Sequence, residues 1–321
     1  MTVRICRYRK GSEVAAALYH DDTIVDLQRF NDQHGGGAPE APVDWGNSLQ
    51  FLPHGAHAAH VRALADYYEQ LGPEVRSGLS QSTSSVDLLP PIPTPIKFFL
   101  LAGNYAEHIQ EGGGEVAERS RTFPYVFLKP ASTTLIGSGA TIVLPSLSPD
   151  TIDWEAELAV VIGQRCKAVS AEQALDVVAG YTVVNDISNR QFRPNPGRDP
   201  RPKDGFFDWL HGKWFDSFAP SGPCVTSSAD LPDPQTLRLQ LKVNGETQQD
   251  SHTSKMIFGV AEVIEFISGF VTLEPGDLIS TGTAAGVGSP RKKFLRHGDT
   301  VEAEIEGIGL VKNPVADEAA S

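Results

Sequence analysis

The most informative segment for the fold is Thr151-Ile-Asp-Trp-Glu-Ala-Glu-Leu-Ala-Val-Val-Ile162. Its second half is a continuous apolar run, as expected for a strand buried on both faces. Its first half alternates, so on a strand Asp153, Glu155 and Glu157 would share one face. Three like charges repel one another, and an unpaired carboxylate beside a buried run is costly. A bound cation would resolve both problems, and the alternative is an acidic, solvent-exposed strand face.

A further acid ends the apolar run Tyr181-Thr-Val-Val-Asn-Asp186. A ligand set made only of carboxylates favours Mg²⁺, Mn²⁺ or Ca²⁺ over zinc, which prefers His or Cys. Acids two residues apart are also common by chance, so spacing alone leaves the metal site and the solvated surface equally open.

Strand signals surround this stretch on both sides. Apolar runs bounded by turn residues predict strands at 3–7, 14–19, 24–27, 97–101, 125–128, 157–162, 181–187, 237–243 and 300–305. A 3.6-residue apolar period predicts helices around 58–71 and 256–267, and a capping pair of Ser170 and Gln173 predicts another through Val178. Closely spaced prolines at 88–96 mark a boundary. We therefore expect a small N-terminal α/β domain (1–95) and a larger, β-rich α+β domain (96–321).

Composition excludes several classes of function. Of the 321 residues, 40% are hydrophobic and 21% charged, as in an ordered globular protein. The net charge of -13 disfavours nucleic acid and anionic membrane surfaces as partners. Three widely separated cysteines, and no apolar run approaching the roughly 20 residues of a membrane helix, predict a cytoplasmic protein.

Seven motifs follow one another over residues 88–312. They are the proline-rich lead-in, Gly103-Asn-Tyr-Ala-Glu-His108, Phe127-Leu-Lys-Pro130, Asp153-Trp-Glu-Ala-Glu157, Asn185-Asp186, Gly212-Lys-Trp-Phe-Asp216 and the glycine-rich segment Gly276 to Gly288. This series resembles the fumarylacetoacetate hydrolase (FAH) family. The resemblance implies a β-roll around the metal, a homodimer, Glu155, Glu157 and Asp186 as ligands of Mg²⁺ (or Mn²⁺ or Ca²⁺), and open metal positions for a small keto acid.

The family motifs also suggest catalytic residues. On a short helix His108 and Glu111 would lie on one side, so the carboxylate could orient the imidazole as a general base. Lys213 matches a family lysine that faces the metal pocket, where a cation would stabilise a developing enolate. Without the family, a solvated surface turn is the favoured explanation of His108 and Glu111, and Lys213 alone could be a surface lysine. The glycines at 112–114 would let this segment order over substrate, or form an ordinary flexible loop.

Substrate contacts are expected from Tyr105, Lys129, Gln191, Arg193 and Thr283. The segment between Asn189 and His211 is longer than in smaller family members and is rich in Pro and Arg. We interpret it as the wall that sets specificity, with Arg193 or Arg198 meeting a second substrate carboxylate. A rigid surface excursion is the alternative.

The leading hypothesis is hydrolysis of a carbon–carbon bond in an acylpyruvate or related 1,3-diketo acid. Water activated by His108 and Glu111 would attack the distal carbonyl, and an enolate would leave. The same enolate chemistry serves a keto-acid decarboxylase or isomerase of the oxaloacetate or hydroxymuconate type, which is the alternative. A metal-bound dimer that only binds a small acid is a third reading.

Overall fold

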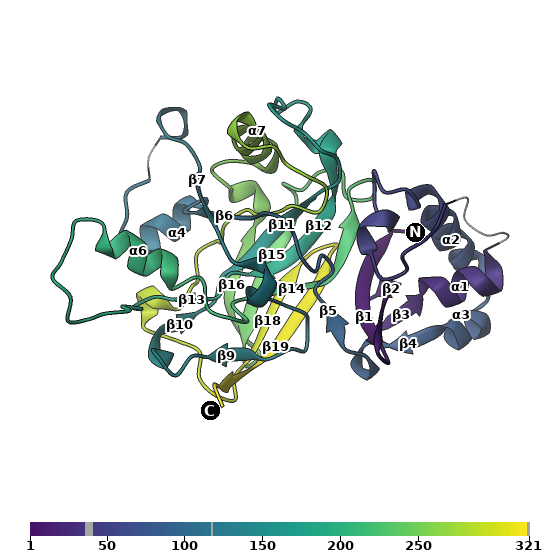
Figure 1. The fold of residues 1–321 in the computed structure, drawn as a ribbon, viewed down its shortest axis with the longest axis horizontal. Coiled ribbons are helices and arrows are strands. Elements are labelled where there is room, and N and C mark those ends of the chain that lie inside the picture. The colour runs from purple at the N-terminus through teal and green to yellow at the C-terminus, as the bar shows by residue number, and fades with distance from the viewer. Residues whose placement is uncertain (36–40, 117, 320–321) are drawn as a thin grey trace.

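The computed structural model describes residues 1–35, 41–116 and 118–319. A twelve-stranded sheet forms its centre (Figure 1). The strands of this sheet are β1 (Arg4–Lys10), β2 (Glu13–His20), β3 (Thr23–Asp26), β4 (Ser80–Ser82), β5 (Leu88–Leu89), β6 (Phe98–Ala102), β7 (Tyr125–Leu128), β8 (Leu135–Ile136), β11 (Ala156–Ile162), β12 (Val178–Asn185), β14 (Ala219–Ser227) and β17 (Leu278–Ser280). They run in the order β4-β3-β2-β1-β14-β12-β11-β17-β6-β7, while β5 pairs with β1 and β8 with β14.

Two smaller sheets complete the β structure. One has five strands in the order β16-β15-β18-β19-β9, and the other pairs β10 with β13. Their bounds are β9 (Ile142–Leu144), β10 (Ile152–Asp153), β13 (Ser188–Asn189), β15 (Arg238–Val243), β16 (Glu246–His252), β18 (Thr300–Ile305) and β19 (Gly309–Asp317). Seven helices flank the sheets: α1 (Leu27–His34), α2 (Ala58–Gln70), α3 (Pro73–Leu79), α4 (Ala106–Glu111), α5 (Ala131–Thr134), α6 (Asp204–His211) and α7 (Val260–Phe270). The mixed, β-rich α+β class is confirmed.

The position of β11 in the sheet accounts for the apolar run at 158–162. It pairs with β12 on one edge and β17 on the other, and all seven of its residues are buried. Leu158 and Val160 belong to one hydrophobic core, shared with α7 and the five-stranded sheet, whereas Ala159 and Val161 belong to a second core. Because both faces are covered, neither face needs polar residues beyond the start of the strand.

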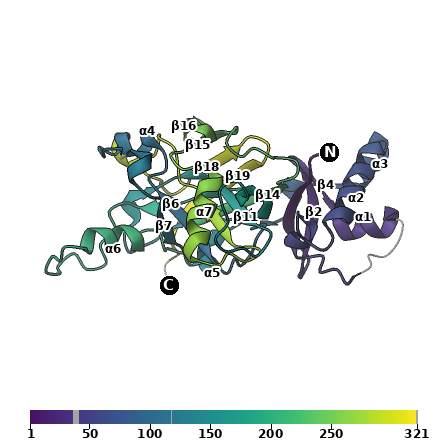
Figure 2. The same cartoon turned by 90° about the horizontal axis from the view of Figure 1, so that it is seen from above.

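The N-terminal segment forms a distinct part of the molecule. Its helices α1, α2 and α3 lie together on the side of β1 to β4 away from the rest of the chain (Figures 1 and 2). β1 nevertheless pairs with β14, with Ile5 opposite Val225, so the large sheet runs through both segments. The domain boundary near residue 95 stays a prediction.

Most expected elements are present, with one exception. The helix expected from Ser170 to Val178 is wrong: Ala174–Val177 form a 3₁₀ turn, and Val178 already begins β12. The turn is brief because the buried, β-branched sequence that follows pairs with β11. In the described part of the chain, no helix is long and apolar enough to cross a membrane.

Candidate metal centre

Three buried carboxylates meet where β11 begins and β12 ends. Glu155 precedes β11, Glu157 lies within it, and Asp186 follows β12. The two strands are antiparallel with Ala156 opposite Asn185, which brings these positions together. The Asp186 backbone N–H donates to the Glu155 carbonyl at 2.8 Å, which fixes the two chain segments to each other.

The geometry of this triad suits one hard cation. One ligand oxygen from each of Glu155, Glu157 and Asp186 lies within 4.8 Å of the other two. An ion with metal–oxygen distances of about 2.0 to 2.6 Å can contact three oxygens at that separation. All the ligand atoms that these residues offer are carboxylate oxygens, which favours Mg²⁺, Mn²⁺ or Ca²⁺.

Glu157 has one oxygen that lacks a partner. Its Oε2 accepts from the Ser280 hydroxyl at 2.6 Å and the Gly282 backbone N–H at 2.9 Å. Among the described residues, nothing donates to its buried Oε1. Burial raises the pKa of Glu157 well above its ordinary value, and the charges of Asp186 and Glu155 add to this. An unpaired buried carboxylate oxygen beside two other acids is what a cation site requires.

Lysine and arginine side chains contact the other two acids, Glu155 and Asp186. Lys213 Nζ donates to Glu155 Oε2 at 2.8 Å and to Asp186 Oδ2 at 2.7 Å. Asp186 Oδ1 forms an ion pair with Lys129, and Glu155 Oε1 lies 2.6 Å from Arg190 Nη2. Burial would raise the pKa of Glu155, but the charges of Lys213 and Arg190 lower it below its ordinary value. Every oxygen of Glu155 and Asp186 therefore contacts a cationic side chain.

His108 and Glu111 form the expected pair on α4. His108 Nδ1 lies 2.9 Å from Glu111 Oε1, and Glu111 is anchored in turn by the Gly286 backbone N–H, 2.9 Å from Oε2. Burial would raise the pKa of Glu111, but the bonds from His108 and Gly286 outweigh it and lower the pKa.

The glycine-rich loop holds acids in place. Gly282, Gly286 and Gly288 each donate a backbone N–H to a different carboxylate. The acceptors are Glu157, Glu111 and Asp153 respectively. A Cβ on Gly288 would lie 1.8 Å from a backbone carbonyl oxygen, so only glycine fits there. Thr283 of this loop was expected to contact substrate, and the glycines of the loop contact the acids of the site.

The expected substrate contacts divide into buried and exposed residues. Thr283 donates to the Ala156 carbonyl at 2.9 Å and accepts from Gln249, so its hydroxyl is already used within the protein. Lys129 is buried, donates to the Ile187 carbonyl at 2.9 Å, and has a pKa lowered by burial. The Tyr105 hydroxyl is buried, and no described residue bonds to it. Its pKa is raised by burial and by the charge of Glu157.

The long segment after Asn189 is fixed onto α6. Gln191 and Arg193 are exposed. Arg198 forms two ion pairs with α6: its Nε donates to Asp204 at 2.9 Å and its Nη2 donates to Asp208 at 2.5 Å. The roles of Gln191 and Arg193 in binding substrate stay predictions.

Two residues of the site were not assigned a role from the sequence. Arg190 Nε donates to Asp153 Oδ2 at 2.8 Å, and Gln249 contacts the backbone N–H of Ala156 through Oε1 at 3.0 Å. Asp153 lies in β10 rather than β11 and is not among the three acids that could share an ion. The only sequence signal for Arg190 is its position four residues after Asp186, a proposed metal ligand. Gln249 carries none, because it comes from a distant strand.

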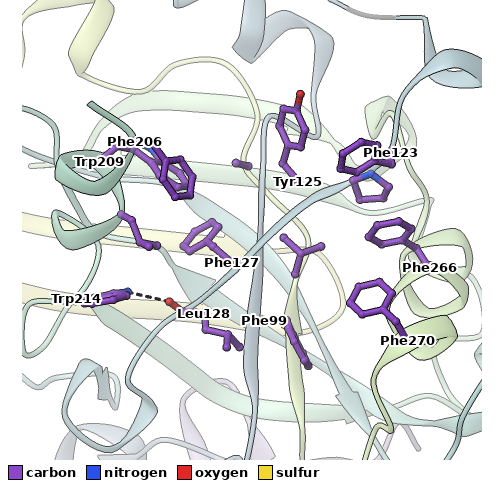
Figure 3. A pocket seen from close by; sticks show the side chains of 14 residues that line it. Phe99, Phe123, Tyr125, Phe127, Leu128, Phe206, Trp209, Trp214, Phe266 and Phe270 are labelled. Atoms are coloured by element: carbon purple, nitrogen blue, oxygen red, sulfur yellow. Dashed lines mark hydrogen bonds between the residues drawn. The ribbon is translucent and has the colours of Figure 1, made fainter. Parts of the chain in front are cut away.

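An apolar groove lies behind the centre. It has a volume of about 850 Å³ and follows β7 between α6 and α7 (Figure 3). Its lining includes Phe127, Trp209, Phe266 and Phe270, and none of the described residues that line it is charged. Lys213 Nζ lies 5.4 Å from the ring of Phe127 and 5.7 Å from that of Trp209, so two rings of the groove lining lie close to a lysine that contacts the triad.

Comparisons with known proteins agree with this geometry. A family model described as "Fumarylacetoacetate (FAA) hydrolase C-terminal" matches residues 97–316. The Bos taurus protein named "Oxaloacetate tautomerase FAHD2A, mitochondrial" is 42% identical over 296 residues, which is 91% of this chain and 83% of that protein.

Two solved structures resemble the whole chain. A 2-hydroxyhepta-2,4-diene-1,7-dioate isomerase from Mycobacterium marinum is 30% identical, with a TM-score of 0.68, and covers 99% of this chain and 100% of its own. Maleylpyruvate hydrolase from Sphingobium sp. SYK-6, solved with manganese(II) and pyruvate, is 26% identical with a TM-score of 0.72 over 98% of this chain and 100% of its own.

Proposed function

The chain belongs to the fumarylacetoacetate hydrolase family, and we propose that it is a divalent-metal-dependent enzyme that moves a proton to or from the carbon beside a keto group in a small keto acid. The observation that carries this proposal is the His108–Glu111 pair, held at 2.9 Å and anchored by the same glycine-rich loop that holds Glu157. The relatives include a tautomerase, an isomerase and a hydrolase, and an enolate is common to all three reactions.

The ion that the site suits is Mg²⁺ or Mn²⁺, with Glu155, Glu157 and Asp186 as its ligands. When bound, such an ion supplies a Lewis acid that polarises the keto oxygen of an α-keto acid. The oxygen-only donors and the unpaired Glu157 Oε1 support this assignment. The manganese complex of the related hydrolase supports it further.

His108 is proposed as the acid–base. Because a carboxylate only accepts hydrogen bonds, the contact with Glu111 puts a proton on Nδ1 and leaves the lone pair on Nε2. Nε2 would take a proton from the carbon next to the keto group and return it to the enolate oxygen. In the opposite direction it would take the proton from the enol oxygen and return it to that carbon. Tautomerisation therefore needs no other reactant. General acid–base catalysis of this kind contributes about 10² to 10⁴ in rate.

The leading substrate class is an oxaloacetate-type keto acid. The support is identity of 42% with an oxaloacetate tautomerase across 91% of the chain. Hydrolysis of an acylpyruvate is the second candidate, because the His108 side chain is 19% exposed and water can reach it. In that reaction His108 would deprotonate the water that attacks the distal carbonyl.

A direct assay separates these candidates. Enol oxaloacetate and a series of acylpyruvates would be followed by ultraviolet absorbance with Mn²⁺ or with EDTA. The proposal expects metal-dependent loss of the enol that His108→Ala slows at least 100-fold, while the exposed control His297→Ala stays at wild-type rate. Cleavage of acylpyruvates alone would replace the tautomerase with the hydrolase, and no turnover of either class would leave only a keto-acid binder.

We also propose a homodimer in a reducing compartment such as the cytoplasm. The groove along β7 supports the dimer, because β7 ends the large sheet and Phe123, Tyr125 and Phe270 beside it are 58%, 63% and 60% exposed. On a chain with a net charge of -13, a surface lined by uncharged residues is where two identical copies could meet without repulsion. The three free, buried cysteines support the compartment.

A further inference from the structure

We propose that Lys213 is the internal counter-ion of the three acids, and that a divalent ion binds by displacing its ammonium group. This inference rests on the metal centre of the proposed function and adds a role for the chain before the ion is bound. The ammonium bridges Glu155 and Asp186, two of the three residues that an ion would have to bridge.

The first support is the position of the ammonium group. Lys213 is 3% exposed, and its Nζ contacts one oxygen of Glu155 and one of Asp186 at 2.8 and 2.7 Å. The ammonium group is therefore a buried donor that bridges two of the three acids.

The second support is that each carboxylate oxygen of Glu155 and Asp186 already has a cationic partner. An ion held by the triad must take one oxygen from Glu155 and one from Asp186, and all four of these oxygens already contact Lys213, Lys129 or Arg190. A doubly charged ion and a lysine ammonium at contact distance repel each other. A carboxylate oxygen can accept from an ammonium and bind an ion at the same time, so it is this repulsion that favours displacement of the cation that bridges both acids.

Of the three cations, Lys213 is the one that can leave. Arg190 is also held by Asp153 at 2.8 Å, and Lys129 also donates to a backbone carbonyl at 2.9 Å. Within the described residues, the hydrogen bonds of Lys213 Nζ go only to Glu155 and Asp186. When the ion takes those acids, no hydrogen bond to a described residue retains the ammonium in its place.

The displaced ammonium has a partner nearby. The rings of Phe127 and Trp209 lie 5.4 and 5.7 Å from Nζ, within the range of cation–π attraction. Trp209 lies in the last turn of α6 and Lys213 follows the helix by two residues, so the two rings can hold the ammonium after the acids have turned to the ion. From there the ammonium can donate to an anionic oxygen of a keto acid.

The test is calorimetric titration of metal-free protein with Mn²⁺ alone. Lys213→Met removes the competing charge, so its Kd for Mn²⁺ should be at least about tenfold tighter than that of the wild type. Lys255→Met is the matched control: this lysine is exposed and pairs with Glu107, and its loss should change the Kd by less than about twofold. The thermal shift on adding Mn²⁺ should also be larger for Lys213→Met than for the wild type.

Two results would overturn different claims. If the wild type does not bind Mn²⁺, the metal centre of the proposed function fails. If the wild type binds and Lys213→Met binds equally or less tightly, the metal centre stands and the displacement is wrong.

Two further measurements test the proposal if Lys213→Met does not fold. Lys213→Gln keeps a hydrogen-bond donor without the charge, and it should also bind Mn²⁺ more tightly. In the wild type, Mg²⁺ should change tryptophan emission, and Trp209→Phe should remove much of that change. If the emission change survives in full and Lys213→Gln binds no more tightly, the proposal is rejected.

Discussion

Arg190 donates through Nε to Oδ2 of Asp153 at 2.8 Å, and this contact connects three segments of the site. Asp153 also accepts from the backbone N–H of Gly288 at 2.7 Å, and Arg190 Nη2 lies 2.6 Å from Glu155. The pair therefore connects the glycine-rich loop, the start of the long segment and a proposed metal ligand. Partners of this kind orient the groups that bind a metal.

The first prediction concerns this pair. Asp153→Asn should weaken Mn²⁺ binding by about 10- to 100-fold, because Glu155 loses its orientation. It should also lower the free energy of unfolding by about 3 kcal/mol, since Arg190 is left with less charge compensation. Calorimetry and urea unfolding measure the two effects. Asp150→Asn is the control, because its carboxylate is 82% exposed. Unchanged Mn²⁺ affinity in Asp153→Asn would contradict the orienting role.

The second prediction concerns the loop that anchors Glu111. Gly286 has φ of 105°, and a Cβ there would lie 2.1 Å from the Gln248 carbonyl oxygen. Gly286→Ala should therefore shift the loop and free Glu111, lowering kcat about 10-fold or more. Steady-state kinetics with enol oxaloacetate would measure this.

Gly269 provides the matched control for this substitution. It lies in α7 with open space around the Cβ position, so Gly269→Ala should leave kcat unchanged and stabilise the protein by about 0.5 to 1 kcal/mol. Equal kcat values for Gly286→Ala and the wild type would show that the loop does not position the pair.

The third prediction concerns pH and the N-terminal segment. Asp26 is buried, caps α1 through the Arg29 backbone N–H at 2.7 Å, and contacts Tyr8 and Lys10. Burial would raise its pKa, but these three contacts outweigh it and lower the pKa below the ordinary 3.8. The folded state therefore binds this proton less tightly than the unfolded state. The stabilisation is present above pH 3.8 and is lost as the pH falls through the folded pKa.

Asp26→Asn keeps the cap and removes the charge. It should cost about 2 kcal/mol at pH 7, most of it from the Tyr8 contact because Lys10 is partly exposed. Its stability should also fall less than that of the wild type below pH 4, by chemical unfolding at several pH values. Asp32→Asn, at an exposed position of α1, is the control. Parallel stability curves for Asp26→Asn and the wild type in acid would refute the assignment.

The fourth prediction concerns the apolar groove. Phe270→Glu places a charge where a second copy would pack, so it should convert the dimer to a monomer in analytical ultracentrifugation. Leu147→Glu carries the same change at a residue that is 67% exposed and does not line the groove, and it should remain dimeric. A dimer that persists in Phe270→Glu and in Tyr125→Glu would place the interface elsewhere.

Local sequence was sufficient for much of the fold and for the identity of the acids. The continuous apolar run of β11 predicts burial on both faces, and the acids before and within it can hardly be buried without compensation. The helix pattern in α7 is similarly local, since one stripe of residues faces the core. The 3₁₀ turn before β12 was missed because the strand that follows it is decided by pairing with β11 rather than by capping residues.

Only the tertiary structure decided what each acid contacts. Nothing local indicates that the backbone N–H groups of a loop more than 120 residues downstream hold Glu157, Glu111 and Asp153. Nor does local sequence show that Lys213 bridges Glu155 and Asp186. The local sequence is enough to show which charges must be buried, because burial follows from the apolar run around them. The tertiary structure decided their partners, because hydrogen bonds and ion pairs depend on distances between segments that are far apart along the chain.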